Sequence, residues 1–276
     1  MQALLGFERW LNGIVWGVPS MILILGVGLY LTIRCGAPQF TKFFYIMKNT
    51  LGKALQKTEA KEGSVSPFKA MCTALAASIG TGNIAGVSGA IAIGGPGAVF
   101  WMWCSALVGM CTKFAEVTLA IQYRERNAKG DWVGGPMYYI TKGLGKNWKW
   151  LAVLFALFGG LASFGIGNMT QINTIAGTIN TAISQFVETS ASQQTIIAWV
   201  ISIICAIIVA IVLLGGIQRL ADVTALLVPV MAIIYIVAAL IVIIVNIGAL
   251  PAAFGAIFKG AFNPAAVSGG LVGVTL

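Results

Sequence analysis

Long runs of apolar residues alternate with shorter polar loops along the chain. Six of these runs are long enough to cross a bilayer as helices, since a crossing takes about 20 residues. They lie at about 15–33, 70–93, 98–121, 150–186, 196–214 and 223–247. The pattern predicts an all-α, polytopic bundle of membrane helices, with residues 1–276 forming a single transmembrane domain.

Two of the six runs are irregular. The second contains a polar, glycine-containing interruption at 78–83. The fourth, 150–186, has about 37 residues, which at 1.5 Å per residue would make a helix of roughly 55 Å. We therefore expect the fourth run to be tilted, bent at its glycines, or extended beyond the membrane.

The composition supports a membrane protein and excludes several other classes. Of 276 residues, 58% are hydrophobic and 9% are charged, against about 25% charged in a typical soluble domain. Histidine is absent, which removes imidazole catalysis and histidine metal sites, and we expect no enzyme and no cofactor. The five cysteines lie in or beside apolar runs without metal-ligand spacing, so we expect them to act as packing residues.

The net charge of +9 follows the loops rather than forming a nucleic-acid surface. Seven Lys or Arg residues follow the first run, six follow the third, and one follows the fifth, which places fourteen of the 17 on one side. Cytoplasmic loops are rich in basic residues. The asymmetry predicts a multi-pass protein of the plasma (inner) membrane with an external N-terminus and no nucleic-acid partner.

The interruption in the second run has the chemistry of a binding site. Gly80 and Gly82 flank Thr81, and Asn83 follows, so the helix is weak at this point. Unwound backbone at membrane depth is tolerated only where it is buried in protein or lines a cavity. A break frees carbonyl oxygens for Na⁺ and exposes a helix N-terminus that attracts a carboxylate. Ser78 adds a further side-chain oxygen at this level.

The same glycines are compatible with a packing role. The spacing Gly82-x-x-x-Gly86 fits a seam where membrane helices approach closely, and such a seam is compatible with a broken helix. A dinucleotide-binding loop is poorly supported, because no β-strand precedes the glycines. A potassium-channel filter is equally unsupported, because no TVGYG-like run occurs.

Polar residues in the fourth run form a second candidate group. They are Asn168, Thr170, Gln171, Asn173 and Thr174. In a continuous helix Asn168 and Gln171, three residues apart, would share a face. A side-chain amide can donate to a carboxylate and accept from an ammonium group, and we favour Gln171 for substrate. The alternative for each residue is a polar clamp between helices.

Ionisable residues occur at two further places in or beside the runs. Lys113 and Glu116 are three apart in the third run, where we expect a mutually neutralised pair near an interior gate. Gln218, Arg219 and Asp222 lie at the cytoplasmic end of the fifth run. We expect this cluster to anchor a loop and contact a gate rather than bind substrate.

Five stretches together resemble the alanine or glycine:cation symporters, a family of sodium-coupled amino-acid transporters. They are 76–86, 113–120, 134–139, 165–171 and 215–222. Their order and separation are similar to the N-terminal portion of that family, over nearly the whole chain.

The resemblance implies a leucine-transporter-type fold of the amino acid–polyamine–organocation superfamily. That fold has two inverted repeats of five helices, and the first helix of each repeat is broken. By this resemblance 15–33 is one extra helix, 70–247 is the first repeat, and 248–276 begins the second. The implied activity is symport of Na⁺ with a small neutral amino acid, alanine or glycine, into the cell by alternating access across the lipid bilayer.

The resemblance also implies roles for individual residues. Asn83, through its side chain, and Ser78, through its carbonyl, would face one Na⁺, while the carbonyls of Ala76 and Ile79 would face another. The substrate carboxylate would meet three residues of the break, and two amides of the fourth run would reach the substrate. The substrate-binding residues are then Gly80, Thr81, Gly82, Gln171 and Asn168.

The chain departs from the family pattern at its end. The family continues into a second broken helix with a Ser-Asn-Glu-Ala-Gly-type segment, and the sequence has no such segment. We therefore expect a C-terminally truncated transporter. The alternatives are a non-transporting membrane fragment, a channel-like protein, or another cation-coupled solute carrier.

Overall fold

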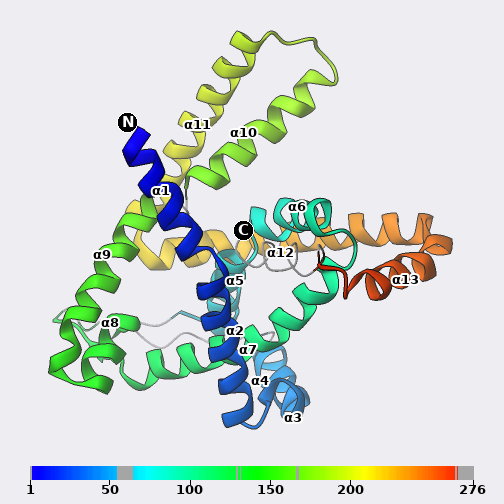
Figure 1. Cartoon of the computed structure of the whole chain (residues 1–276). Coiled ribbons are helices and arrows are strands. Elements are labelled where there is room, and N and C mark those ends of the chain that lie inside the picture. Colours follow the sequence, from blue (N-terminus) through cyan, green and yellow to red (C-terminus); the bar gives the residue numbers. More distant parts are fainter. Residues whose placement is uncertain are drawn as a thin grey trace. The chain divides into compact units, whose positions relative to one another are not determined.

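The computed structural model describes residues 2–54, 65–128, 130, 132–165, 168–264 and 266. In chain order its helices are α1 (Gln2–Val15), α2 (Val18–Arg34), α3 (Pro38–Thr41), α4 (Phe43–Ala54), α5 (Pro67–Ser78), α6 (Ala85–Gly94), α7 (Ala98–Gln122), α8 (Pro136–Tyr139), α9 (Lys149–Gly165), α10 (Met169–Ser184), α11 (Ala191–Leu214), α12 (Gly216–Val245) and α13 (Leu250–Gly260) (Figure 1). Short 3-10 turns lie at Thr81–Asn83, Lys146–Trp148 and Ile247–Ala249, and a π-helical turn lies at Ile140–Leu144. Two-residue strands β1 (Glu125–Arg126) and β2 (Trp132–Val133) pair antiparallel, with Glu125 opposite Val133. The predicted all-α membrane bundle is confirmed, with this small hairpin as an addition.

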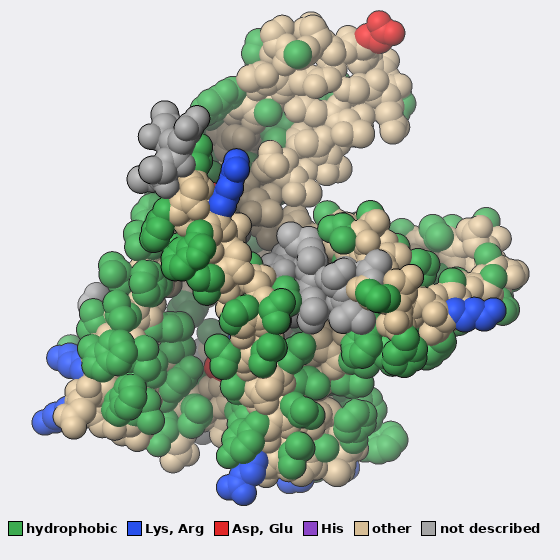
Figure 2. Space-filling model, in the orientation of Figure 1, with side chains coloured by type: hydrophobic (Ala, Val, Ile, Leu, Met, Phe, Trp, Pro, Cys, Tyr) green, Lys and Arg blue, Asp and Glu red, His purple; other side chains and the backbone are tan. Residues whose placement is uncertain are grey.

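Apolar helical surface dominates the described residues. Five helical stretches in the described part of the chain are long and apolar enough to cross a membrane. They are Leu5–Arg34, Ala98–Gln122, Lys146–Ser184 (which includes two residues outside the described set), Ala191–Leu214 and Gly216–Val245. Figure 2 shows hydrophobic side chains exposed over much of the visible face, as expected where lipid rather than water is the solvent.

The helix boundaries follow local sequence signals. Pro67 begins α5, and the Ser66 hydroxyl accepts a hydrogen bond from the Lys69 N–H at 3.4 Å, an ordinary N-cap. Ser190 and Gln193 form a capping box at the start of α11. Gly95, with φ of 70°, follows the end of α6 in a conformation that glycine adopts readily, and the turn at this residue leads into α7.

The chain forms two compact units. The first contains residues 1–53, 82–122 and 239–276, and the second contains residues 54–81 and 123–238. The expected start of a second repeat, 248–276, includes α13, while residue 265 and residues 267–276 lie outside the described set.

In the first unit, α2 packs closely on α7 at Gly28. A Cβ atom at Gly28 would lie 2.5 Å from Val108 Cγ1 and 2.9 Å from Thr112 Oγ1. Membrane helices commonly pack through small residues, because these allow the backbones to approach. Thr32 and Gln39 add polar contacts: Thr32 Oγ1 donates to the Gly28 carbonyl at 2.8 Å, and Gln39 Nε2 donates to the Leu107 carbonyl at 3.3 Å.

The same unit joins α13 to the start of α7. A Cβ atom at Gly97 would lie 2.3 Å from the Gly260 carbonyl, so the two backbones touch at this point. The Trp101 indole N–H donates to the Ala261 carbonyl. The Phe100 ring lies 5.9 Å from the Phe258 ring, measured between centroids, in an edge-on arrangement. These contacts hold α13 against the start of α7.

In the second unit, the turn before Pro136 contains Gly135 with φ of 110°, and α8 then begins at Pro136. The β-hairpin that precedes it carries Arg124 and Arg126 over the Trp132 ring, with guanidinium carbons 4.3 and 4.9 Å from the ring centroid. Further along this unit, α10 and α11 form a helical hairpin.

Candidate functional site

The helix of the second apolar run is broken. Helix α5 ends at Ser78, Ile79 is extended with φ of −95° and ψ of 111°, and the 3-10 turn Thr81–Asn83 follows before α6 begins at Ala85. The boundary between the two units falls inside the break, between Thr81 and Gly82. The residues on each side are therefore taken separately.

On the α5 side, the predicted Na⁺ ligands Ala76, Ser78 and Ile79 lie at the helix end. The last four carbonyls of an α-helix lack an intrahelical partner, and the helix stops within this segment. The Ile79 N–H still donates to the Leu75 carbonyl at 2.8 Å, which closes the final turn. The Ser78 hydroxyl donates to the Ala74 carbonyl at 2.9 Å, so its proton is directed back along the helix. The C-terminal end of α5 thus offers backbone carbonyl oxygens as hard ligands for Na⁺.

On the α6 side, Gly82 and Asn83 lie in the 3-10 turn that leads into the helix. The N-cap residue of α6 is Ile84, whose apolar side chain offers no acceptor to the first N–H groups. The first turn of α6 therefore retains N–H groups and the positive end of the helix dipole. This is the local chemistry that favours an anion, and the glycine-rich sequence produces it.

Within the second unit, the structure brings together two predicted substrate residues, Gly80 and Gln171. A Cβ atom at Gly80 would lie 3.0 Å from Gln171 Nε2 and 3.9 Å from both Cδ and Oε1. The Gln171 carboxamide therefore lies against the backbone of the break, where a side chain at residue 80 would require it to shift. Gln171 belongs to the first turn of α10 and is only partly exposed.

Asn168 stands at the start of α10, three residues before Gln171. It is the N-cap residue, with φ of −115° and ψ of −52°, and its carbonyl accepts a hydrogen bond from the Ile172 N–H at 3.0 Å. Its side-chain amide is used locally, with Nδ2 donating to the Ser163 carbonyl at 3.0 Å. A joint role of the two amides at a substrate stays a prediction.

The remaining polar residues of α10 are largely occupied with their own helix. Thr174 Oγ1 donates to the Thr170 carbonyl at 3.0 Å, and Thr178 Oγ1 donates to the Thr174 carbonyl at 2.8 Å. Such bonds satisfy a hydroxyl locally. Gln171 is therefore the polar residue of this helix that the structure places beside the break.

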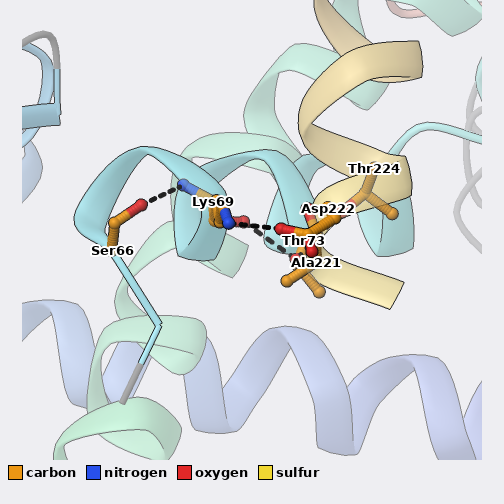
Figure 3. Close-up of polar contacts among 6 residues, drawn as sticks. All are labelled: Ser66, Lys69, Thr73, Ala221, Asp222 and Thr224. Carbon is orange, nitrogen blue, oxygen red and sulfur yellow. Dashed lines mark hydrogen bonds and ion pairs between the residues drawn. The ribbon is translucent and has the colours of Figure 1, made fainter. Parts of the chain in front are cut away.

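Helix α5 and the start of α12 are joined by a polar contact that the sequence did not indicate. Figure 3 shows Lys69 in an ion pair with Asp222, and one helical turn further the Thr73 and Thr224 hydroxyls lie 3.0 Å apart. The side chains of Lys69 and Asp222 are 44% and 57% exposed, so the pair has the modest strength of a surface contact, about 0.2–1 kcal/mol. Lys69 and Thr73 are four residues apart, which places them on one face of α5. This spacing was the sequence signal for a shared polar contact on that face.

The expected pairing of Lys113 with Glu116 is confirmed. Lys113 Nζ lies 2.8 Å from Glu116 Oε2 within α7. Asp222 pairs with Lys69. In the part of the chain that the structure describes, no group of three or more His, Cys, Asp or Glu residues could hold a metal ion. A cation at the break would thus be held by backbone and neutral side-chain oxygens.

Comparison with known proteins gives a consistent identity. The family model of the sodium:alanine symporter family matches residues 1–276. The chain is 44% identical over 267 residues to the sodium/alanine symporter AgcS of Methanococcus maripaludis, covering 96% of this chain and 55% of that protein. It is 43% identical over 260 residues to the amino-acid carrier protein AlsT of Bacillus subtilis, covering 94% of this chain and 51% of AlsT.

A third relative has another substrate in its name. The chain is 36% identical over 269 residues to a Bacillus subtilis protein named as a probable sodium/glutamine symporter, GlnT, covering 96% of this chain and 52% of that protein. The chain thus spans about half the length of the curated relatives it matches. With its apolar helices, its broken helix and a family match over its whole length, the chain is a multi-pass membrane protein that belongs to the sodium:alanine symporter family.

Proposed function

We propose that this chain forms part of a carrier that moves a small neutral amino acid, alanine or glycine, into the cell together with Na⁺. The observation that carries the proposal is the broken helix with the Gln171 carboxamide against Gly80. The relatives named as sodium/alanine symporter and amino-acid carrier support it. The function is that of a transporter and not of an enzyme, with Na⁺ as the coupling ion and no other cofactor.

The substrate carboxylate is bound at the break. The N–H groups of Gly80, Thr81 and Gly82 and the positive end of the α6 dipole offer it hydrogen bonds without a compensating buried charge. Gln171 reaches the substrate from α10, because an amide can donate to the carboxylate or accept from the ammonium group. Asn168 is the weaker member of the set, since its amide donates to the Ser163 carbonyl.

Sodium is bound by the oxygens that the same break releases. The Asn83 side chain and the Ser78 carbonyl form one position, and the carbonyls of Ala76 and Ile79 form the other. Residues 70–94 contain no Asp, Glu, Lys, Arg or His, so the segment has no side chain that would carry a coupling proton. This supports Na⁺ rather than H⁺ as the coupling ion.

The fold that we propose is of the leucine-transporter type. In it, helix α2 is the extra N-terminal helix, and the first repeat begins with α5 and α6 and ends with α12. Alternating access needs one repeat or bundle to move against another. The charge distribution supports a plasma-membrane location with the N-terminus outside.

The test is uptake of radiolabelled alanine into proteoliposomes that contain the complete protein. An inward Na⁺ gradient should drive accumulation, and replacing Na⁺ by choline should abolish it. Unlabelled alanine, glycine and glutamine added in separate reactions identify the substrate by competition. Accumulation that persists in choline would refute the sodium coupling, and competition by glutamine alone would refute the small-substrate assignment.

A further inference from the structure

The first helix of the chain has two chemically different faces. In α1 the large apolar side chains recur at spacings of three and four residues, which places them on one side of the helix. This face consists of Phe7, Trp10, Leu11 and Ile14. The opposite side carries Glu8, Arg9 and Asn12, together with Leu5. The apolar face is uncovered: the exposed fractions of Phe7 and Trp10 are both 61%.

Helix α1 is also separated from the membrane helix that follows it. The Trp16 N–H donates to the Asn12 carbonyl at 2.8 Å, and the chain is then extended at Gly17, with φ of −93° and ψ of −172°. A Cβ atom at Gly17 would lie 1.9 Å from the Gly13 carbonyl oxygen, so this bend accepts only glycine without a shift of the backbone. Helix α2 then begins at Val18, with Pro19 in its first turn. Figure 1 shows α1 leaving the axis of α2 at this point.

The lengths favour α2 alone as the crossing. Its 17 residues give about 25 Å, and Trp16 and Gly17 extend it towards the roughly 30 Å of a hydrocarbon core. A single straight helix over Leu5–Arg34, which has 30 residues, would measure about 45 Å. Such a helix would also carry Glu8 and Arg9 towards the bilayer, where charged side chains are costly.

We propose that α1 lies in the plane of the lipid–water interface beside the N-terminal end of α2, with its apolar face in the membrane. A short amphipathic helix with a charged face and Trp and Phe on the other face binds at this level, with the apolar side about 5–10 Å inside the headgroup boundary. Trp10 and Trp16 suit this position, because indole rings gather at the membrane interface. The occupant of the uncovered face is therefore phospholipid, continuous with the lipid around α2.

The test measures the depth of single residues along α1. The complete protein, with its native cysteines replaced, carries one nitroxide-labelled cysteine at a time at Phe7, Arg9, Leu11, Asn12 or Ile14. Each variant is reconstituted into phosphatidylcholine–phosphatidylglycerol vesicles, and the collision rates with oxygen and with a water-soluble nickel complex give the depth of the label. Gel filtration in detergent checks that each variant is folded.

The expected result is an oscillation of depth with the helical period. Labels at Phe7, Leu11 and Ile14 should lie about 5–10 Å below the headgroup boundary, and labels at Arg9 and Asn12 should lie above it. Depth that rises steadily from residue 7 to residue 14 would mean that α1 continues the crossing, and would overturn the proposal. Labels at Phe7 and Leu11 that neither reagent reaches would mean that protein covers this face, and would overturn it as well.

A matched pair of charged variants provides an independent measurement. With the label at Ile14, Leu11→Lys should move the label towards water by several ångströms, because it places an ammonium group on the apolar face. Asn12→Lys adds the same charge to the polar face and should leave the depth unchanged. Equal effects of the two substitutions would contradict the proposal. Neither measurement depends on transport, so its outcome is independent of the proposed function.

Discussion

Replacing Gly80 by Ala tests the contact at the centre of the candidate site. The new methyl carbon would lie 3.0 Å from Gln171 Nε2, which is tighter than an ordinary van der Waals contact. The carboxamide must therefore shift by a few tenths of an ångström. Because it is the end of a flexible side chain, the protein should fold normally, and the cost should appear in substrate binding.

The magnitude follows from the hydrogen bond at risk. A hydrogen bond to a charged group contributes about 1.5–3 kcal/mol, which corresponds to about a 10- to 150-fold change in affinity. Gly80→Ala should therefore raise the KM for sodium-driven alanine uptake by at least about tenfold. Gln171→Ala should raise the KM by a similar factor, because it removes the same bond.

The assay is a double-mutant cycle on initial uptake rates in proteoliposomes. If Gly80→Ala acts by displacing Gln171, the double variant should be hardly worse than either single variant, since interacting residues are not additive. Gly177→Ala in α10 is the matched control: a methyl group there has nothing within 4 Å, and the KM should stay within about twofold of the native value. An unchanged KM for Gly80→Ala, or fully additive effects in the double variant, would refute the reasoning.

Three further predictions concern other parts of the chain. Gly28→Ala should lower the thermal unfolding midpoint in detergent, because its methyl group would lie 2.5 and 2.9 Å from α7 side-chain atoms and overpacking costs about 1–3 kcal/mol. Gly26→Ala is the control and should leave the midpoint unchanged, because a methyl group there has nothing within 4 Å. Equal midpoints for the two variants would contradict the packing at Gly28. Either single exchange, Lys69→Asp or Asp222→Lys, should destabilise the folded protein by about 0.2–1 kcal/mol or somewhat more. The double exchange should recover stability in thermal unfolding. No recovery would show that the ion pair contributes nothing to stability. Asn83→Ala should raise the Na⁺ concentration needed for half-maximal uptake, and an unchanged sodium dependence would remove Asn83 from the ligand set.

Much of the helix content follows from composition alone. In lipid the backbone must satisfy its own hydrogen bonds, so long apolar runs form helices wherever they occur. The runs expected at 98–121 and 196–214 are the helices α7 and α11, extended by a few residues at most. Glycines occupy the turns at Gly95 and Gly135, where the backbone adopts conformations that side chains disfavour.

Spacing along the sequence did not indicate how each side chain is used. Asn168 and Gln171 are three residues apart, but the Asn168 amide donates to the Ser163 carbonyl while the Gln171 amide lies against Gly80. Helical spacing predicts the direction of a side chain and not its partner.

The sequence by itself determined that this is an all-helical membrane protein, and it indicated the weak point at Gly80 through the low helix propensity of glycine. Both are local properties of the chain and its solvent. Only the tertiary structure decided which distant residue meets that point. The contact of Gln171 with Gly80 and the pairing of Lys69 with Asp222 join residues 91 and 153 positions apart along the chain. Such contacts depend on how whole helices pack, and no local pattern encodes their partners.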